Sequence, residues 1–181
     1  MTRDVQQLSL DGVPSPLGTL LVVHDGEGRL RALDFPDYEG RMHRLLRLHY
    51  GKDGYTLSSS PAPRALKASL DAFFAGDLEA IDAIAVRTGG TDFQRFVWAA
   101  LRRIPAGTTT SYGQLAATIG RPDAVRAVGL ANGANPVVIV VPCHRVIGAD
   151  GSLTGYGGGI ARKRWLLAHE RACVGRRRAS A

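Results

Sequence analysis

One stretch decides the interpretation of this 181-residue chain: Val137-Val138-Ile139-Val140-Val141-Pro142-Cys143-His144-Arg145-Val146. The β-branched run at its start predicts a buried strand. Pro142 then predicts a rigid turn, because its ring fixes the backbone. We therefore expect a buried strand that delivers the thiol of Cys143, one of two cysteines in the chain, to a fixed turn.

Cys143 and His144 form a candidate nucleophile and base. A thiol reacts as its thiolate, and a neighbouring base or positive charge promotes that form. His144 and Arg145 supply both. Consecutive side chains of an extended segment point to opposite faces, so either the chain turns sharply after Pro142 or a water bridges thiol and imidazole. Taken alone, a single cysteine of this kind is more often a small core residue, so the surrounding sequence must decide.

Length and composition favour an intracellular protein of two small domains. With 45% hydrophobic residues the chain can bury a core. No apolar run approaches the ~20 residues of a membrane helix, and the polar start does not resemble a secretory signal. Cys143 and Cys173 are too few for a disulfide scaffold and lack zinc-site spacing. We expect a cytoplasmic protein with no metal, no other cofactor and no membrane partner.

The positive charge is concentrated in the second half of the chain. Residues 92–181 carry thirteen basic and four acidic side chains, whereas residues 1–91 carry ten basic and twelve acidic ones. This asymmetry indicates that the second half binds a polyanion. The tail Arg176-Arg177-Arg178 is predicted to be a solvated end.

The first half predicts an antiparallel sheet with helices. Two apolar runs, Leu17–His24 and Arg29–Phe35, flank a Gly-rich turn and predict a hairpin. Helices are expected at Tyr38–Tyr50 and Pro63–Phe74, and a short strand at Ala83–Val86. His43 and His49 are six residues apart on the first of these helices, so they do not share a face and are expected at the surface.

The second half predicts a helix-turn-helix with a wing. Capping boxes start helices at Thr91–Gln94 and Ser111–Gln114, and Gly120 ends the second of these. A further helix is expected from Pro122 to Ala131. Asp150-Gly151 marks a hairpin turn within Val146–Leu153, and Ile160–His169 has the spacing of a closing amphipathic helix. The fold class is α/β (α+β): residues 1–87 form the sheet domain, 88–91 a linker, 92–172 the winged helix-turn-helix domain and 173–181 a flexible basic tail.

The helix after Pro122 has an unusually slim face. Its small residues, Ala124, Ala127, Ala131 and Ala134, recur at helical spacing, and two glycines, Gly129 and Gly133, thin the helix further. A slim helix can approach another surface closely, although tight packing in the core is an equal alternative. Arg126 interrupts the small residues and could project from the same surface.

Residues 91–170 resemble the O6-alkylguanine-DNA alkyltransferase family, also called methylated-DNA–protein-cysteine methyltransferases. The resemblance rests on the Pro-Cys-His-Arg-Val signature at 142–146 and on flanking motifs at the family's spacings. These are Thr110–Ala116, Arg126–Gly129, Asn135-Pro136, Gly155-Tyr156 and Trp165–Glu170. It implies a suicidal DNA repair protein whose substrate is double-stranded DNA containing O6-alkylguanine, or O4-alkylthymine, and which flips the damaged base out of the duplex.

The resemblance also implies a role for each site residue. Cys143 would accept the alkyl group, His144 would take its proton through a water, and Glu170 would orient His144. Tyr112 would donate to the departing guanine, and Asn135 would shape the turn. In the DNA interface, Arg126 would replace the flipped nucleotide while the other expected contacts are Tyr112, Ala127, Gly129 and Ala131. The alkyl pocket would involve Val146, Tyr156 and Gly157.

Some positions depart from the vertebrate pattern of the family. Val138 stands where a second proline would follow Asn-Pro, and Gly157 stands where serine is common. The first domain has no cysteine, and hence none of the zinc ligands that some relatives carry there. We expect a monomer in solution, with cooperative clustering on DNA left open.

Two other functions compete with DNA repair. In a non-catalytic winged-helix protein Cys143 would be a core residue, but alkyltransferase-like damage sensors commonly carry tryptophan in its place. A thiol hydrolase built on Cys143 and His144 would need an oxyanion hole, which the sequence does not suggest. Cys173 is expected to be an incidental thiol, because no base-and-turn setting surrounds it.

Overall fold

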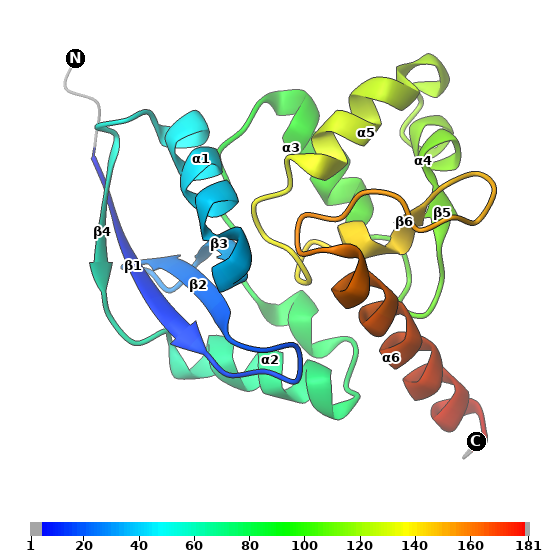
Figure 1. Cartoon of the computed structure of the whole chain (residues 1–181), viewed down its shortest axis with the longest axis horizontal. Coiled ribbons are helices and arrows are strands. Elements are labelled where there is room, and N and C mark those ends of the chain that lie inside the picture. Colours follow the sequence, from blue (N-terminus) through cyan, green and yellow to red (C-terminus); the bar gives the residue numbers. More distant parts are fainter. Residues whose placement is uncertain (1–4, 180–181) are drawn as a thin grey trace.

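The structure is a computed structural model that describes residues 5–179. In it, a four-stranded sheet lies beside a group of helices (Figure 1). The strand order is β3-β2-β1-β4, and the strands are β1 (Gln6–Val13), β2 (Leu20–Asp25), β3 (Leu30–Asp34) and β4 (Tyr55–Ser59). The predicted hairpin is the antiparallel pair β2–β3. The α+β class is confirmed, but β1 and β4 were not predicted and pair in parallel, so the sheet is mixed rather than antiparallel.

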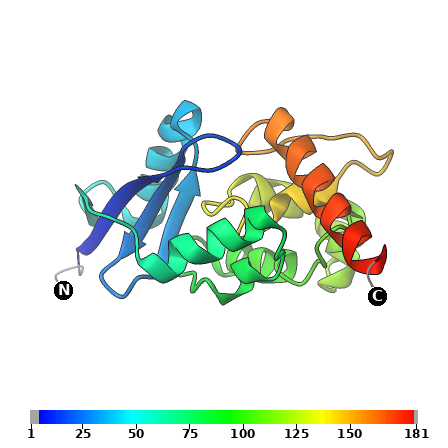
Figure 2. The same cartoon turned by 90° about the horizontal axis from the view of Figure 1, so that it is seen from below.

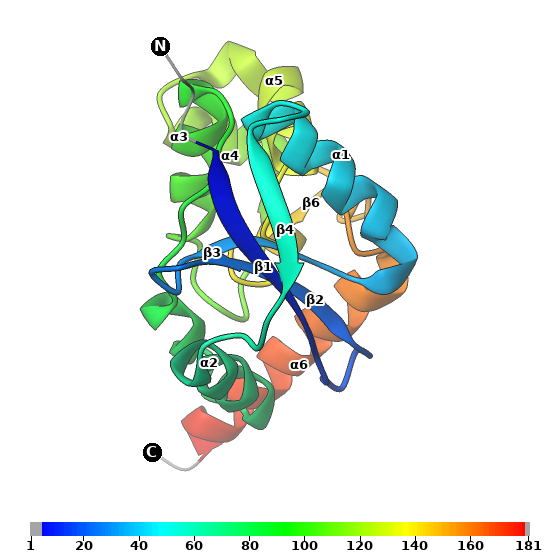
Figure 3. The ribbon, with the colours of Figure 1, turned by 90° about the vertical axis from the view of Figure 1, so that its left-hand side faces the viewer.

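Alternating side chains of the sheet pack on two sides. Val23 and Ala32 lie against α1 (Glu39–Tyr50), whose Met42 and Leu46 complete a small cluster. The neighbouring side chain of Val22 points the other way, into the main core. That core also receives α2 (Arg64–Ala75) through buried residues of its apolar face, which are Leu66, Leu70 and Phe73. Figure 3 shows the sheet toward the viewer with α1 beside it and α2 below.

The predicted helix-turn-helix is present in the second half. A capping box at Thr91 starts α3 (Asp92–Leu101), and a second one at Ser111 starts α4 (Tyr112–Thr118). The short 3-10 turn η3 (Pro122–Ala124) leads into α5 (Val125–Gly133), which packs on both α3 and α4. Trp98 Nε1 of α3 donates to the carbonyl of Ala131 at 2.8 Å, so α5 is fixed to the helix beneath it.

The run Val137–Val141 is buried, but it is not the strand that its composition predicts. Val137 alone forms a bridge, to Leu33 of β3, and the chain then coils so that Val141 N donates to Val137 O at 3.0 Å. Ile139 has a φ of +73°, which is rare for a β-branched residue and ends any extended conformation. The apolar composition of this run therefore predicts its burial correctly. Its backbone conformation is determined by contacts with β3 and within the loop.

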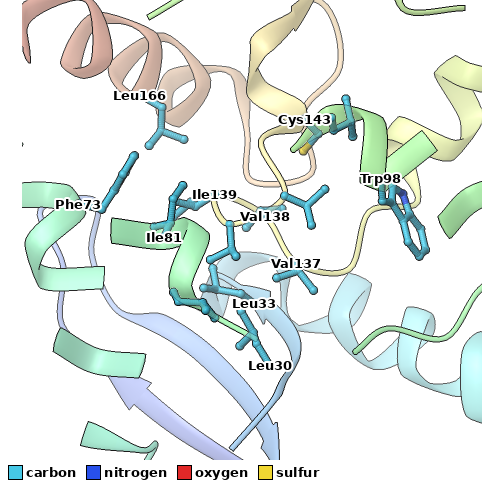
Figure 4. Close-up of a cluster of buried hydrophobic side chains, with 14 of the residues drawn as sticks. Leu30, Leu33, Phe73, Ile81, Trp98, Val137, Val138, Ile139, Cys143 and Leu166 are labelled. Atoms are coloured by element: carbon cyan, nitrogen blue, oxygen red, sulfur yellow. The ribbon is translucent and has the colours of Figure 1, made fainter. Parts of the chain in front are cut away.

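The two halves share one core. The cluster in Figure 4 brings Leu30 and Leu33 of the sheet and Phe73 of α2 against Val138 and Leu166 of the second half. The linker at 88–91 therefore joins two parts of one packed body. The strand expected at Ala83–Val86 is smaller than predicted: a 3-10 turn, η2 (Ala80–Ala83), precedes a single bridge between Val86 and Leu30.

The C-terminal region differs from the prediction in two ways. β6 (Val146–Ile147) pairs in parallel with β5 (Thr110–Ser111) instead of forming a hairpin with residues up to Leu153, although a turn at Asp150-Gly151 is present. α6 (Ile160–Ala179) continues far beyond His169, as Figure 2 shows. The prediction of a flexible tail from 173 is wrong for residues 173–179, because Cys173 is buried and holds the last turns of α6 against the core. No helix in the described part of the chain is long and apolar enough to cross a membrane.

Candidate active site

The signature residues lie on one 3-10 turn. Pro142 leads into η4 (Cys143–Arg145), and Arg145 N donates to Pro142 O at 3.0 Å. The sharp turn expected after Pro142 is therefore present. Cys143 is 2% exposed. Among the described residues its Sγ accepts a hydrogen bond from Asn135, and no direct bond to His144 is formed.

Asn135 fixes the loop that carries the thiol. Its Nδ2 donates to Cys143 Sγ at 3.1 Å and to Val141 O at 2.8 Å, while its Oδ1 accepts from Val137 N at 2.9 Å. The side chain is fully buried. Burial raises the pKa of the Cys143 thiol, and the bond from Asn135 only partly opposes this. The resting thiol is therefore protonated at neutral pH, so a base must take its proton during a reaction.

His144 is held as a neutral base. Its Nε2 lies 2.8 Å from Oε1 of Glu170, and both side chains are fully buried. Because a carboxylate accepts, Nε2 carries the proton and Nδ1 keeps its lone pair. Burial lowers the pKa of His144 more than Glu170 raises it. Nδ1 is buried and has no hydrogen-bond partner among the described residues, so it is the basic atom of the pair.

Glu170 is itself fixed by three donors besides His144. Arg145 donates from Nε and from Nη2, the latter at 2.9 Å, and the backbone N of Gly107 donates at 2.9 Å. Burial raises the pKa of Glu170, but the hydrogen bonds and charges of His144 and Arg145 outweigh it and leave the pKa at about 2. The carboxylate therefore stays ionised. Arg145 donates to Glu170 and not to the thiol of Cys143.

Lys163 is a buried cation that the sequence analysis missed. Its Nζ donates to Val146 O at 2.6 Å and to Thr154 O at 2.8 Å, with Gly155 O further away at 3.4 Å. It thereby joins the segment after the catalytic turn to the Gly-rich loop. The signal was a lysine on the apolar face of α6, in line with Leu166 and Leu167.

Of the residues expected to form the alkyl pocket, Tyr156 lies against His144. The ring of Tyr156 meets the His144 ring edge-on, with centroids 6.3 Å apart, and its buried hydroxyl has no partner among the described residues. Burial raises the pKa of Tyr156, so its hydroxyl remains a donor. Val146 is fully buried, and its carbonyl is already occupied by Lys163.

Arg41 of α1 is a second residue that the sequence analysis missed. Its guanidinium pairs with Asp34 at 2.7 Å and donates to Gly133 O at 2.9 Å and to Asn135 O at 2.7 Å. A Cβ on Gly157 would lie 2.5 Å from the guanidinium carbon. Arg41 therefore links the first half of the chain to the end of α5 and to the loop that carries Gly157, which we call the pocket loop. No local sequence pattern reveals this contact.

The residues expected to contact DNA do not all share one surface. Arg126 and Ala127 are exposed on α5, and Gly129 is half-buried beside Tyr112, whose ring lies 3.8 Å from an ideal Cβ at that glycine. Ala131 is 2% exposed and faces α3, so it supports α5 from beneath instead of lying on its outer face. Leu130, 77% exposed, lies on the outer face.

Two further expectations need correction. His49 is half-buried instead of lying freely at the surface: it packs against Trp98, and burial lowers its pKa. Cys173 does have polar neighbours, since Arg176 Nη2 donates to its Sγ at 3.1 Å and the His169 ring lies 3.9 Å away. Within residues 5–179 no group of three or more histidine, cysteine or acidic side chains could hold a metal ion.

Known proteins match this arrangement over most of the chain. The family model of the DNA-binding domain of 6-O-methylguanine DNA methyltransferase matches residues 92–172. The methylated-DNA–protein-cysteine methyltransferase of Salmonella typhimurium is 56% identical over 158 residues, which cover 87% of this chain and 92% of the relative.

Solved structures give the same result. The crystal structure of Mycobacterium tuberculosis O6-methylguanine methyltransferase has a TM-score of 0.75 at 42% identity, covering 91% of this chain and 93% of that one. The M. tuberculosis protein in complex with DNA has a TM-score of 0.74 at 42% identity, covering 92% and 94%. With its cysteine, histidine and glutamate arranged as described, the chain belongs to the methylated-DNA–protein-cysteine methyltransferases.

Proposed function

We propose that this protein repairs DNA directly, by moving the alkyl group of O6-alkylguanine irreversibly to Sγ of its own Cys143. The observation that carries this proposal is a buried thiol beside a histidine that a fixed carboxylate holds in its basic form. Family membership supplies the substrate class. Each molecule would act once, because a thioether has no leaving group that the site could expel.

The reaction is a displacement at the alkyl carbon. As the thiol proton passes to Nδ1 of His144 through a bridging water, Sγ forms a bond to the alkyl carbon and the bond from that carbon to O6 breaks. The departing guanine anion takes a proton from the hydroxyl of Tyr112, which then recovers a proton from water as the imidazolium of His144 releases its own. Glu170 receives no proton; it holds His144 in position and stabilises the imidazolium. No developing oxyanion on a carbonyl is involved, so the site needs no oxyanion hole.

The target atom lies inside a duplex, so the nucleotide must leave the base stack. We propose that α5 enters the minor groove, where the small exposed side chain of Ala127 and the half-buried Gly129 permit close approach. Arg126 is exposed and its side chain forms no hydrogen bond or ion pair within residues 5–179, so it is available to occupy the space of the flipped nucleotide. Ala131 would act by placing α5 on α3.

Affinity would rest mainly on phosphate contacts, because the second half of the chain carries most of the positive charge. We further propose that the protein is a monomer in solution and that it acts in the cytoplasm.

The test is intact-protein and peptide mass spectrometry after incubation with a duplex containing one O6-methylguanine. We expect one methyl group per molecule, on Cys143. Cys143→Ala should bind the duplex without accepting the group, while Cys173→Ala should react like the unchanged protein. Methylation of Cys173 instead, or full transfer to Cys143→Ala, would contradict the proposal.

The same samples separate the competing functions. A non-catalytic damage sensor would bind the duplex and leave Cys143 unmodified. A thiol hydrolase would turn over a fluorogenic ester repeatedly, and that turnover would disappear in Cys143→Ala.

A further inference from the structure

A cavity of about 580 Å³ lies outside the DNA-binding domain, where the end of α1 meets the linker. Its polar lining comes from two arginines, a histidine, a tyrosine, a threonine and a glutamine: Arg31, Arg87, His49, Tyr50, Thr88 and Gln6. All of them precede residue 92. We call this space the linker cavity. Its volume lies within the range of small-molecule sites, roughly 300–1,000 Å³.

The linker cavity carries positive charge without a matching acid. Among the described residues that line it there is no aspartate or glutamate. Arg31 is 4% exposed and pairs with Asp25, but the same carboxylate oxygen also accepts from Arg29. The guanidinium of Arg87 forms no ion pair or hydrogen bond within residues 5–179. Arg29 also pairs with Glu27, so the excess positive charge of the cavity comes from Arg87, and an anion there would meet this unpaired guanidinium beside the fixed donors of Arg31.

The donors of the linker cavity are held in place before any ligand arrives. Arg31 is fixed by Asp25, by the hydroxyl of Tyr50 and by Gln6, yet each of its terminal nitrogens retains a further N–H. His49 is fixed by its contact with Trp98, and its Nε2 is buried without a partner among the described residues. Two guanidinium forks and an imidazole around one cavity match the oxygens of a phosphate group.

We propose that the linker cavity binds a phosphate monoester of nucleotide size. The phosphate lies between Arg31 and Arg87, with His49 as a further donor, and the rest of the ligand fills space that a bare phosphate would leave open. The site is separate from the alkyl acceptor, since it shares no residue with the Cys143 network. The phosphate could belong to a free nucleotide or to a nucleic-acid end, which the experiment distinguishes.

The test is isothermal titration calorimetry of the full-length protein with deoxyadenosine monophosphate at constant ionic strength. One molecule should bind per chain, and deoxyadenosine, which lacks the phosphate, should not bind. Arg87→Ala should weaken binding about tenfold, the loss expected for one charge-assisted hydrogen bond. Arg64→Ala is the matched control, because Arg64 is an exposed arginine outside the cavity, and it should change the affinity less than twofold, about 0.4 kcal/mol.

Arg87→Ala should keep its circular dichroism spectrum and its rate of methyl transfer, since the exposed side chain forms no hydrogen bond or ion pair within the described residues. Equal affinity in Arg87→Ala and the unchanged protein would overturn the proposal, as would absence of binding or an equal loss in Arg64→Ala. A short duplex with a 5′ phosphate, compared with one without, identifies the source: displacement of the nucleotide by the phosphorylated duplex alone assigns the cavity to a DNA end. If neither duplex displaces the nucleotide, the ligand is a free phosphate ester.

Discussion

Nδ2 of Asn135 bonds both the thiol of Cys143 and the carbonyl of Val141, so one amide sets the position of the nucleophile and the shape of the loop that carries it. The turn that carries the thiol, η4, is a single 3-10 turn of three residues, so it depends on Asn135 for its position.

Asn135→Ala should therefore lower both stability and transfer rate. The change leaves Val137 N buried without a partner and removes one of the two donors to Val141 O, which still accepts from Cys143 N, at a cost of about 1–3 kcal/mol in the free energy of unfolding. Urea unfolding and single-turnover methyl transfer provide the measurements. Asn132→Ala is the matched control: this neighbouring asparagine is also buried, but its Oδ1 has no partner among the described residues, so the loss should be smaller. Equal losses in the two variants would contradict the role of Asn135.

The stability of the protein should fall in acid because of Glu170. Hydrogen bonds overcome burial and lower its pKa from 4.5 to about 2 in the folded protein. A depressed folded pKa stabilises the protein above the unfolded pKa, and this contribution of about 3 kcal/mol is lost as the pH falls from 4.5 toward 2. Urea unfolding at several pH values measures the slope.

Glu170→Gln is the control for this acid dependence. The variant should be less stable at pH 7, because Arg145 loses its buried ion-pair partner. It should also show a shallower decline between pH 4.5 and 2, since the titrating group is gone. An unchanged slope would assign the acid sensitivity elsewhere, for instance to Asp25, whose pKa is also held at about 2.

The rate of alkyl transfer should depend on neutral His144. Burial lowers its pKa below 6.5, so the base remains available throughout the neutral range. We expect a rate that is flat from pH 8 to about 6.5 and falls at lower pH as the imidazole is protonated. Stopped-flow transfer from a methylated duplex gives the profile. A rate that already declines from pH 8 to pH 7 would show that another group controls proton transfer.

Arg126→Ala should slow repair of duplex DNA by about tenfold or more, because an intercalated side chain no longer offsets the few kcal/mol needed to unstack the base. Transfer from the free base O6-methylguanine requires no flipping and should keep its rate. Arg178→Ala, which removes an equal charge from the far end of α6, should leave both rates nearly unchanged. Parallel loss on the duplex and on the free base would place Arg126 in the chemistry of the thiol.

Gly157 and Arg41 should be energetically coupled. A side chain at Gly157 would collide with the guanidinium of Arg41, which Asp34 and two backbone carbonyls hold in place. Gly157→Ser should destabilise the protein by about 1–3 kcal/mol, and by much less once Arg41→Ala has removed the obstacle. A double-mutant cycle in urea measures the coupling. Additive losses would mean that the loop moves away without cost.

Local signals predicted the parts of this fold that depend on neighbours in sequence. The capping boxes at Thr91 and Ser111, the hairpin of β2 and β3, and the Cys143–His144 turn all follow from short patterns. The family resemblance added the pairing of His144 with Glu170, which the structure contains.

The incorrect predictions have one physical cause: contacts between residues distant in sequence override the local conformational preference. Val137–Val141 coils because Asn135 and β3 hold it, against its preference for a strand. β4 pairs with β1 across some fifty residues of chain. Arg41 reaches the pocket loop from the other half of the molecule, and nothing in its own helix indicates this.

The shared core of the two halves has a practical consequence for work with pieces of the chain. Residues 92–172 contain every proposed catalytic group, yet if this segment were produced alone, Val138 and Leu166 would lose the side chains of the sheet and of α2. Such a fragment would expose apolar surface and aggregate. Co-expressed with residues 1–91, it should recover solubility and methyl acceptance together, because the two segments would then complete one shared hydrophobic core.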